Sequence, residues 1–294
     1  MDFSNAKKLL ELCDSNGMSI SEVMKQREYD EGTSSKEEII KKMRRVLEIM
    51  RDSATTPVNT PMKSMGGLIG GEAKKLNDYS QEKKNIGGSV LSRGIMYAVA
   101  VLECNASMGL IVAAPTAGSS GVVPGLLLAM QDVYSFSDEK VIDALFASGA
   151  IGYLAMRNAT VAGAVGGCQA EMGVASAMAA AAAVAIMGGS PAQSAHAFAM
   201  ALGNLLGLVC DPVAGLVEVP CVKRNTVGST NALICADMAL AGIENQIPAD
   251  EVIEAMYKVG RNMPRELRET GLGGLADTPT GNRIKMRIFG REVT

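Results

Sequence analysis

One long uncharged stretch limits most strongly what this chain can fold into. It covers residues 172–189, MGVASAMAAAAAVAIMGG, and alanine is its commonest residue. A run of this kind either crosses a membrane or lies at the centre of a helical core. Alanine contributes little to membrane insertion but lets neighbouring helices approach closely. We therefore predict a central helix enclosed by other helices, with no membrane association.

The chain beyond residue 60 predicts an all-α fold. Its composition shifts to Ala, Gly and Met with few charges, and alternating β-branched residues are scarce. Ala and Met favour helix over strand. Helical runs separated by short Gly or Pro breaks are expected at about 92–110, 122–132, 138–157, 169–187, 191–208, 229–243 and 249–262. We expect one all-α body at 56–294, with Gly-rich loops that converge on a site.

The first 55 residues form a helical N-terminal segment with a different composition. They are polar and charged, and two capping-box patterns, Ser19 with Glu22 and Ser35 with Glu38, mark helix starts. The second helix, near 36–52, carries an apolar stripe opposite its Lys and Arg residues. We expect this helix to pack on the larger body and not on a membrane surface.

Charge and the N-terminus restrict the partners and the location. Lys and Arg number 28 against 31 Asp and Glu, which leaves a net charge of −3 over 294 residues. This gives no electrostatic footprint for nucleic acid or an anionic membrane, so a small neutral or zwitterionic partner fits better. The first residues, MDFSNAKKLLELCDSNG, place charges where a secretory signal needs an apolar run. We expect a cytoplasmic protein.

The six cysteines divide into two groups. In a reducing compartment they are expected to be buried, metal-binding or catalytic, because disulfides rarely persist there. Cys104 and Cys235 lie inside apolar helical runs and Cys13 lies at the end of a small helix, so these three are interpreted as buried or incidental thiols. The chain has one His, His196, which falls mid-helix and is expected to be packed. A mixed Cys/His zinc site or a His-based triad is therefore hard to assemble.

The other three cysteines have Gly and Pro neighbours. Cys168, Cys210 and Cys221 lie in VGGCQAE, LVCDPVAG and EVPCVKRN, and we expect all three in loops. Three thiolates are too few for a closed four-thiolate site but suit a [4Fe–4S] cluster with one open iron, which can act as a Lewis acid. At such long spacing, unrelated core cysteines are the alternative.

Two glycine-rich segments are candidate ligand loops. Residues 63–71, KSMGGLIGG, do not match a Walker A pattern, and their backbone amides are either free to bind a carboxylate or part of a close-packed loop. Residues 115–121, PTAGSSG, precede a predicted helix and offer the hydroxyls of Thr116 and Ser119 at its N-terminus. An ordinary helix cap is the alternative reading of this second segment.

Further polar residues adjoin the cysteine segments. Arg224 follows Cys221 closely and is either a cation beside the site or a solvated surface cation. Asn158 and Glu171 lie within reach in sequence of the same segments. Arg268, in RETGLGGLA, either helps to shape the cavity or belongs to a helix C-terminus that Gly271 ends.

Four of these segments together resemble one enzyme family. They are APTAGSSGVVPG, CQAEMGVASAMAAAA, LGLVCDPVAGLVEVPCVKRN and RETGLGGLA, and the likeness covers roughly residues 60–276. They are similar to the α domain of bacterial iron–sulfur L-serine dehydratases. The resemblance implies that Cys168, Cys210 and Cys221 hold a [4Fe–4S] cluster, without pyridoxal phosphate, whose open iron acts as a Lewis acid while L-serine becomes pyruvate and ammonia.

The same resemblance implies a set of site residues and a partner. The residues expected to bind substrate are Ser64, Gly66, Gly67, Thr116, Ser119, Asn158 and Arg224. No base is assigned, and its candidates are Lys63, Ser64 and Glu171. Relatives occur as one fused chain or as α and β subunits, and the segment before this body lacks the β-type half, so we expect a β subunit in a hetero-oligomer.

Rival functions stay open at this point. An electron-transfer iron–sulfur protein would normally use four thiolates at shorter spacings, and a structural subunit would leave the cysteines unoccupied. A pyridoxal-phosphate lyase is opposed by the all-α prediction. Serine and threonine differ by one methyl group, worth about 1–3 kcal/mol in a pocket, so the choice between these two substrates also stays open.

Overall fold

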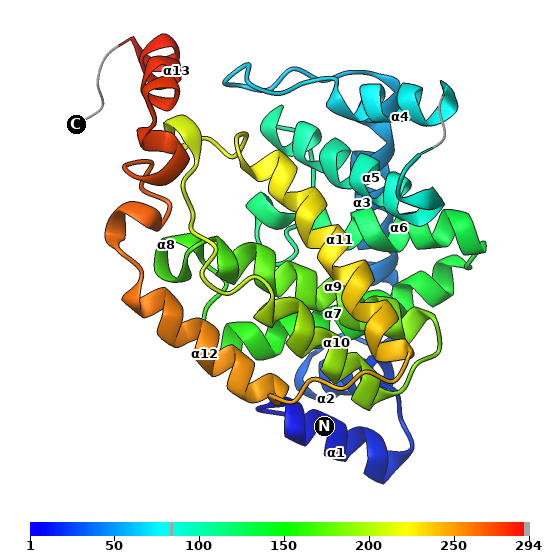
Figure 1. Cartoon of the computed structure of the whole chain (residues 1–294). Helices are drawn as coiled ribbons and strands as arrows, with labels where there is room; N and C mark the ends of the chain where they lie inside the picture. The colour runs from blue at the N-terminus through cyan, green and yellow to red at the C-terminus, as the bar shows by residue number, and fades with distance from the viewer. Residues whose placement is uncertain (83–84, 291–294) are drawn as a thin grey trace.

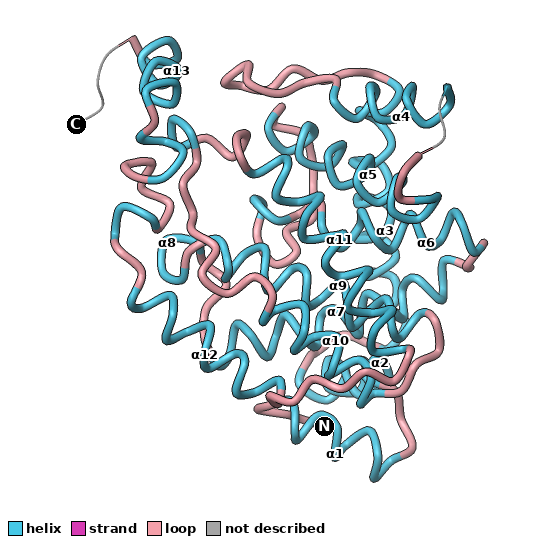
Figure 2. The backbone as a smooth tube through the Cα atoms, in the orientation of Figure 1, coloured by secondary structure: helices cyan, strands magenta, loops and turns pink. Residues whose placement is uncertain are grey.

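The computed structural model describes residues 1–82 and 85–290. Within these ranges the chain is built of α-helices and short 3₁₀ or π turns, and no strand occurs (Figures 1 and 2). The predicted all-α fold is confirmed. The α-helices are α1 (Ala6–Asn16), α2 (Ile20–Glu31), α3 (Lys36–Asn59), α4 (Glu72–Glu82), α5 (Gly88–Ala106), α6 (Val122–Tyr134), α7 (Asp138–Asn158), α8 (Gly163–Gly166), α9 (Val174–Ile186), α10 (Pro191–Gly203), α11 (Cys221–Leu240), α12 (Ala249–Asn262) and α13 (Pro279–Phe289).

Five shorter turns connect these helices, and several of them lie at the site described below. Four are 3₁₀ turns and one, η2, is a single π-helical turn that continues directly into α9. They are η1 (Ala117–Ser119), η2 (Gln169–Gly173), η3 (Val213–Gly215), η4 (Arg265–Leu267) and η5 (Gly274–Asp277).

Both predicted capping boxes start helices. At the start of α2 the Glu22 amide donates to Ser19 Oγ at 3.2 Å, and the Ser19 amide donates to Glu22 Oε2 at 2.8 Å. The same reciprocal pair joins Ser35 and Glu38 at the start of α3, at 3.2 and 2.9 Å. These bonds satisfy amides that a helix cannot pair internally. Helix α3 runs on to Asn59, across the boundary expected near residue 55.

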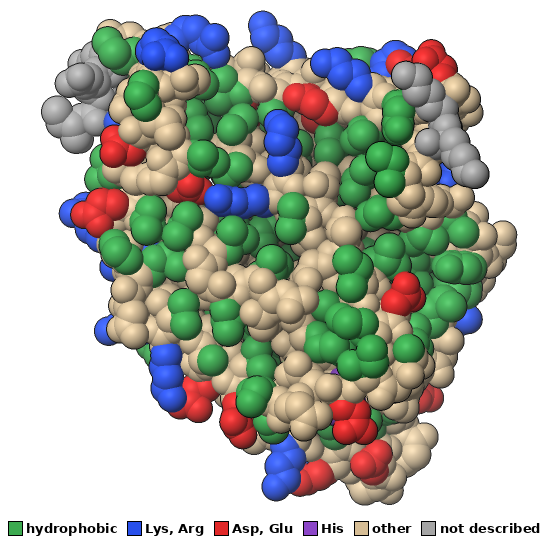
Figure 3. Space-filling model, viewed as in Figure 1, with side chains coloured by type: hydrophobic (Ala, Val, Ile, Leu, Met, Phe, Trp, Pro, Cys, Tyr) green, Lys and Arg blue, Asp and Glu red, His purple; other side chains and the backbone are tan. Residues whose placement is uncertain are grey.

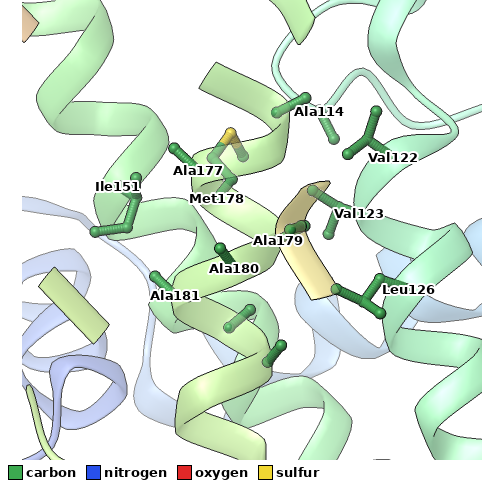
Figure 4. Packing of buried hydrophobic residues seen from close by; sticks show 14 of the residues in the cluster. Ala114, Val122, Val123, Leu126, Ile151, Ala177, Met178, Ala179, Ala180 and Ala181 are labelled. Atoms are coloured by element: carbon green, nitrogen blue, oxygen red, sulfur yellow. The ribbon is translucent and has the colours of Figure 1, made fainter. Parts of the chain in front are cut away.

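The alanine-rich stretch forms the central helix, as predicted. The segment Gln169–Ile186 is long and apolar enough to cross a membrane, and 94% of it is buried inside the protein. Helices α6, α7, α10 and α11 all contact α9. In Figure 4 the alanines of α9 lie between Ile151 of α7 and the α6 residues Val123 and Leu126. Small side chains allow these helices to pack closely around one buried axis.

The start of the central helix meets two other helix starts. Turn η1, which leads into α6, contacts both η2 and the first part of α11. The segment between α10 and α11 lies beside these starts and beneath α13 (Figure 1). Around the start of α11, between α13 and the loop before α4, the surface carries hydrophobic side chains together with Lys and Arg (Figure 3). The fold thus gathers several helix N-termini in one region.

Candidate functional site

The structure brings the segments of Cys168, Cys210 and Cys221 together. Cys168 directly precedes η2, Cys210 lies in the segment after α10, and Cys221 is the first residue of α11. All three thiols are buried, with exposures of 2, 4 and 9%. The neighbouring Cys168 side chain and burial raise the pKa of Cys210 far above its usual range. Burial, then the nearby Cys168 and Glu171, raise the pKa of Cys221 to about 12. The contributions of Cys168 to both shifts place the Cys168 thiol close to the other two.

The expectation that all three cysteines lie in loops is wrong for two of them. Cys221 begins helix α11, with Pro220 as its N-cap. Proline is tolerated at a helix start because the first amides have no internal partner there. Cys168 immediately precedes the π turn. Only Cys210 is extended: its amide donates to the Leu267 carbonyl at 2.8 Å, and its carbonyl accepts from the Glu269 amide at 2.7 Å.

The other three cysteines lie inside helices, as predicted. Cys13 belongs to α1, Cys104 to α5 and Cys235 to α11, and all are buried. Burial raises the pKa of Cys13 and of Cys235 to about 11. Buried thiols whose pKa is raised in this way are typical of inert cysteines.

Glu171 is the candidate base that lies among the cysteines. It stands on the π turn and is 9% exposed. Its Oε1 accepts from Thr116 Oγ1 at 2.7 Å, and its Oε2 accepts from Cys210 Sγ at 3.6 Å. Burial raises the pKa of this carboxyl group. The backbone approaches it closely: a Cβ added at Gly163 would lie 2.6 Å from Oε2 and 3.2 Å from Cys210 Sγ.

Asn225 joins the first turn of α11 to the loop that carries Thr116. This side chain is fully buried. Its Oδ1 accepts from the Gly121 amide at 2.9 Å, and its Nδ2 donates to the carbonyls of Gly118 and Cys221 at 2.8 and 2.9 Å. In the sequence Asn225 is only the last residue of EVPCVKRN, and it was not predicted as a site residue because its partners lie in a distant segment. It holds the cysteine turn and the loop in one arrangement.

Ser119 is used within its own turn. Its hydroxyl donates to the Ala114 carbonyl at 3.4 Å and lies 3.1 Å from Thr116 Oγ1. The side chain is fully buried. The alternative reading of this segment, a local cap, therefore describes Ser119 well, whereas the Thr116 hydroxyl reaches out to Glu171.

Arg224 is not a solvated surface cation. Its side chain is 17% exposed, and its Nη1 lies 2.7 Å from Asp211 Oδ1. The same nitrogen donates to the Val209 carbonyl at 2.8 Å. Asp211, which was not predicted as a site residue, is 3% exposed and also accepts from the Leu275 amide at 2.7 Å. The cation therefore lies beside the Cys210 segment, although its contacts are to this chain's own groups.

The glycine-rich loop at 63–71 does bind a carboxylate, but the carboxylate belongs to the protein. Glu218 accepts from Ser64 Oγ at 2.6 Å, from the Gly66 amide at 2.6 Å and from the Leu68 amide at 2.9 Å. Amides that we expected to be free for a substrate carboxylate are thus occupied in this conformation. Lys63 and Gly67 are exposed. The sequence signal for Glu218 is a single acidic residue in the otherwise apolar run AGLVEVPC.

Three further candidates lie in structural contacts. Asn158 is exposed at the end of α7, and its Nδ2 donates to the carbonyls of Ser4 and Leu154 at 2.9 and 3.0 Å, which fastens the N-terminus. His196 is partly buried and its Nδ1 accepts from the Asn245 amide at 3.1 Å, as the packed-histidine prediction requires. Arg268 pairs by its backbone with Cys210 and directly follows the 3₁₀ turn η4, whereas α12 ends at Asn262, so no α-helix is ended by Gly271 as one reading expected.

Comparison with known proteins agrees with these motifs. A family model described as serine dehydratase alpha chain matches residues 15–276. The chain is 51% identical to a probable L-serine dehydratase, alpha chain, of Bacillus subtilis (strain 168), over 98% of this chain and 96% of that protein. It is 44% identical to the L-serine dehydratase, alpha chain, of Peptoniphilus asaccharolyticus, over 96% of this chain and 97% of that one. It is also 40% identical to L-serine dehydratase TdcG of Escherichia coli (strain K12), over 94% of this chain but 62% of that protein.

Proposed function

The chain belongs to the family of serine dehydratase alpha chains, and from this we propose that it is the catalytic α subunit of an L-serine dehydratase. Such a lyase converts L-serine to pyruvate and ammonia. The observation that carries the proposal is the gathering of three buried cysteines and the buried carboxyl group of Glu171 where three helix starts meet. These four residues also lie in the motifs that resemble the family.

The donor set fits the [4Fe–4S] cluster that the family resemblance implies. Nowhere in residues 1–82 and 85–290 are three His, Cys, Asp or Glu side chains arranged to hold a single metal ion. A cubane cluster does not need three ligands around one metal ion, because each thiolate binds its own iron. Cys168, Cys210 and Cys221 supply three thiols from three separate segments. Cys221, as the first residue of α11, also lies where a helix favours a negative charge.

The chain's own residues would supply the base and hold the reacting groups in place. A bound cluster would supply Lewis acidity that polarises the β-hydroxyl group of serine. Among the candidate bases, Ser64 is held by Glu218 and Lys63 is exposed, whereas Glu171 lies beside Cys210. We assign Glu171 Oε2 as the atom that accepts the Cα proton: Thr116 engages Oε1 and fixes the carboxyl group, and Cys210, as a thiolate ligand, would have no proton to donate to Oε2. Loss of hydroxide then gives aminoacrylate, which tautomerises and hydrolyses to pyruvate and ammonia.

Substrate binding is proposed to involve two residues most directly. Thr116 contacts Glu171, and Arg224 contacts the backbone next to Cys210, so both adjoin the cysteine segments. A guanidinium group is suited to a substrate carboxylate. Ser119 supports the Thr116 turn, while Ser64 and Gly66 hold Glu218 in place.

We propose that a separate β subunit completes the enzyme. Two relatives are named alpha chain, and TdcG extends well beyond the 62% of its length that this chain matches. Large apolar side chains are exposed on two adjoining turns: Met65 at 74%, Met108 at 78% and Leu110 at 65%. The Met65 amide donates to the Ala106 carbonyl at 2.9 Å, which joins these turns. Exposed apolar groups of this kind mark protein contacts, and we propose that the β subunit covers them, in a cytoplasmic complex.

The test is anaerobic purification of the chain alone and of the chain co-expressed with a β subunit. We expect iron and acid-labile sulfide in both, and pyruvate release from L-serine that rises strongly in the complex. L-Threonine is assayed in parallel to define the substrate. Iron and sulfide without pyruvate in the complex would favour electron transfer, and full turnover by the chain alone would show that no partner is needed.

A further inference from the structure

We propose that Glu218 is a positioning residue: its buried carboxylate fastens the glycine-rich loop at 63–71 to the segment that runs from Cys210 to Cys221. The inference rests on the proposed function, because it assigns this contact to the same site. Nothing in the motifs or relatives assigns a role to this side chain. Its contacts within the fold are what point to it.

Among the residues that the structure describes, the carboxylate takes its hydrogen bonds from the loop alone. Oε2 accepts from Ser64 Oγ at 2.6 Å and from the Leu68 amide at 2.9 Å, and Oε1 accepts from the Gly66 amide at 2.6 Å. Ser64 Oγ accepts in turn from the Ile69 amide at 3.3 Å, which closes the loop on itself. The donors lie some 150 residues away in sequence: the separations are 154, 150 and 152. This side chain therefore contributes three of the hydrogen bonds that hold the loop in place, beside the bond from the Met65 amide to the Ala106 carbonyl.

Burial makes the contact difficult to open. Glu218 is only 2% exposed, and a carboxylate removed from water is stable only when donors replace its hydration. If the loop moved away, the carboxylate would lose those donors and the loop amides would lose their acceptor. The fit is close as well: a Cβ added at Gly66 would lie 2.8 Å from Glu218 Oε1 and 2.5 Å from Leu216 Cδ1.

The backbone of Glu218 carries the restraint toward the cysteine. Its carbonyl accepts from the Val222 amide at 3.0 Å, so Glu218 takes part in the first turn that presents Cys221. The loop and the start of α11 are thus both bonded to Glu218, the loop through its side chain and the helix start through its backbone. Loss of the carboxylate should loosen the loop and weaken substrate binding, while the three cysteines stay available.

The experiment compares Glu218→Ala and Glu218→Gln with Glu22→Ala in the complex with the β subunit. Glu22 is a matched control, because its carboxylate also accepts from a serine hydroxyl and an amide, but at the exposed start of α2. Three quantities are measured: kcat and KM for L-serine, iron and sulfide content, and the rate of tryptic cleavage after the exposed Lys63. Cleavage reports on the loop without any turnover.

We expect Glu218→Ala to raise KM about ten- to hundredfold, as for the loss of a buried charged acceptor, with a smaller effect on kcat. Cleavage after Lys63 should accelerate while iron and sulfide stay at the wild-type level. Glu218→Gln keeps an acceptor oxygen and should recover part of both losses, and Glu22→Ala should change neither. Wild-type cleavage and KM in Glu218→Ala would overturn the proposal. If no variant, wild type included, releases pyruvate, the proposed function fails, and cleavage alone still decides the role of Glu218.

Discussion

Replacing Asn225 with alanine should damage both the stability of the protein and the site. The side chain is fully buried and bonds to the Gly121 amide, the Gly118 carbonyl and the Cys221 carbonyl. Removal leaves the Gly121 and Gly118 groups without these partners. Each unsatisfied buried group costs about 1–3 kcal/mol, so the loss of partners for these two groups should lower the free energy of unfolding by about 2–6 kcal/mol.

Urea denaturation of the metal-free chain, followed by far-ultraviolet circular dichroism, measures this loss, because bound metal would couple to unfolding. Asn231→Ala is the control: this residue lies on the same helix and bonds to Ser176 Oγ and the Ala201 carbonyl. Both variants should be destabilised, but only Asn225→Ala should also lose turnover, since it alone detaches the Thr116 loop from the Cys221 turn. A loss of stability below about 0.5 kcal/mol, or equal loss of turnover in both variants, would refute the reasoning.

Three further predictions concern the same region and its surroundings. Gly163→Ala should abolish turnover, because the new Cβ would lie 2.6 Å from Glu171 Oε2. Gly149→Ala is the control and should keep turnover, because a Cβ there meets nothing within 4 Å; equal kcat values for the two variants would contradict the prediction. Burial raises the pKa of Glu103 above the ordinary 4.5, so the folded state favours the protonated carboxyl group. This stabilising contribution is lost as the pH rises above about 4.5, and the urea midpoint of Glu103→Gln should therefore rise relative to that of wild type between pH 5 and pH 7.5. A difference between the two midpoints that stays the same at both pH values would refute this prediction. Exposure to air with a chelator should remove activity while the circular dichroism spectrum stays unchanged, since an iron without a protein thiolate is lost most readily. Ferrous iron with a thiol reductant should then restore the activity. Full activity after prolonged aeration would argue against an open iron.

The helices were predictable where local signals decide them. The run expected at 138–157 is α7, Asp138–Asn158, and the run at 249–262 is α12 within the same bounds. Ser137 caps α7 in the usual way, with its hydroxyl accepting from the Lys140 amide. Apolar periodicity and helix caps depend on residues close together in the chain, so the sequence alone predicts them.

The start of α11 was missed for the opposite reason. A helix was expected only from about residue 229, yet α11 begins at Cys221. The polar residues after Cys221 resemble a loop in sequence, but Asn225 is buried by partners in the segment at 118–121. Glu218 was not predicted for the same reason, since its hydrogen-bond donors lie about 150 residues away. Long-range polar contacts of this kind leave no periodic signal.

The cysteines themselves provide the most direct test of the whole assignment. Cys168→Ala, Cys210→Ala and Cys221→Ala are purified anaerobically with the β subunit, beside Cys104→Ala and Cys235→Ala, whose thiols are buried within α5 and α11. Iron, acid-labile sulfide and pyruvate release from L-serine are measured for each. We predict that every one of the first three loses both cluster and turnover, because two thiolates cannot retain a cubane with one open iron, while the two controls keep both. Wild-type iron content and turnover in any of the first three variants would contradict the assignment.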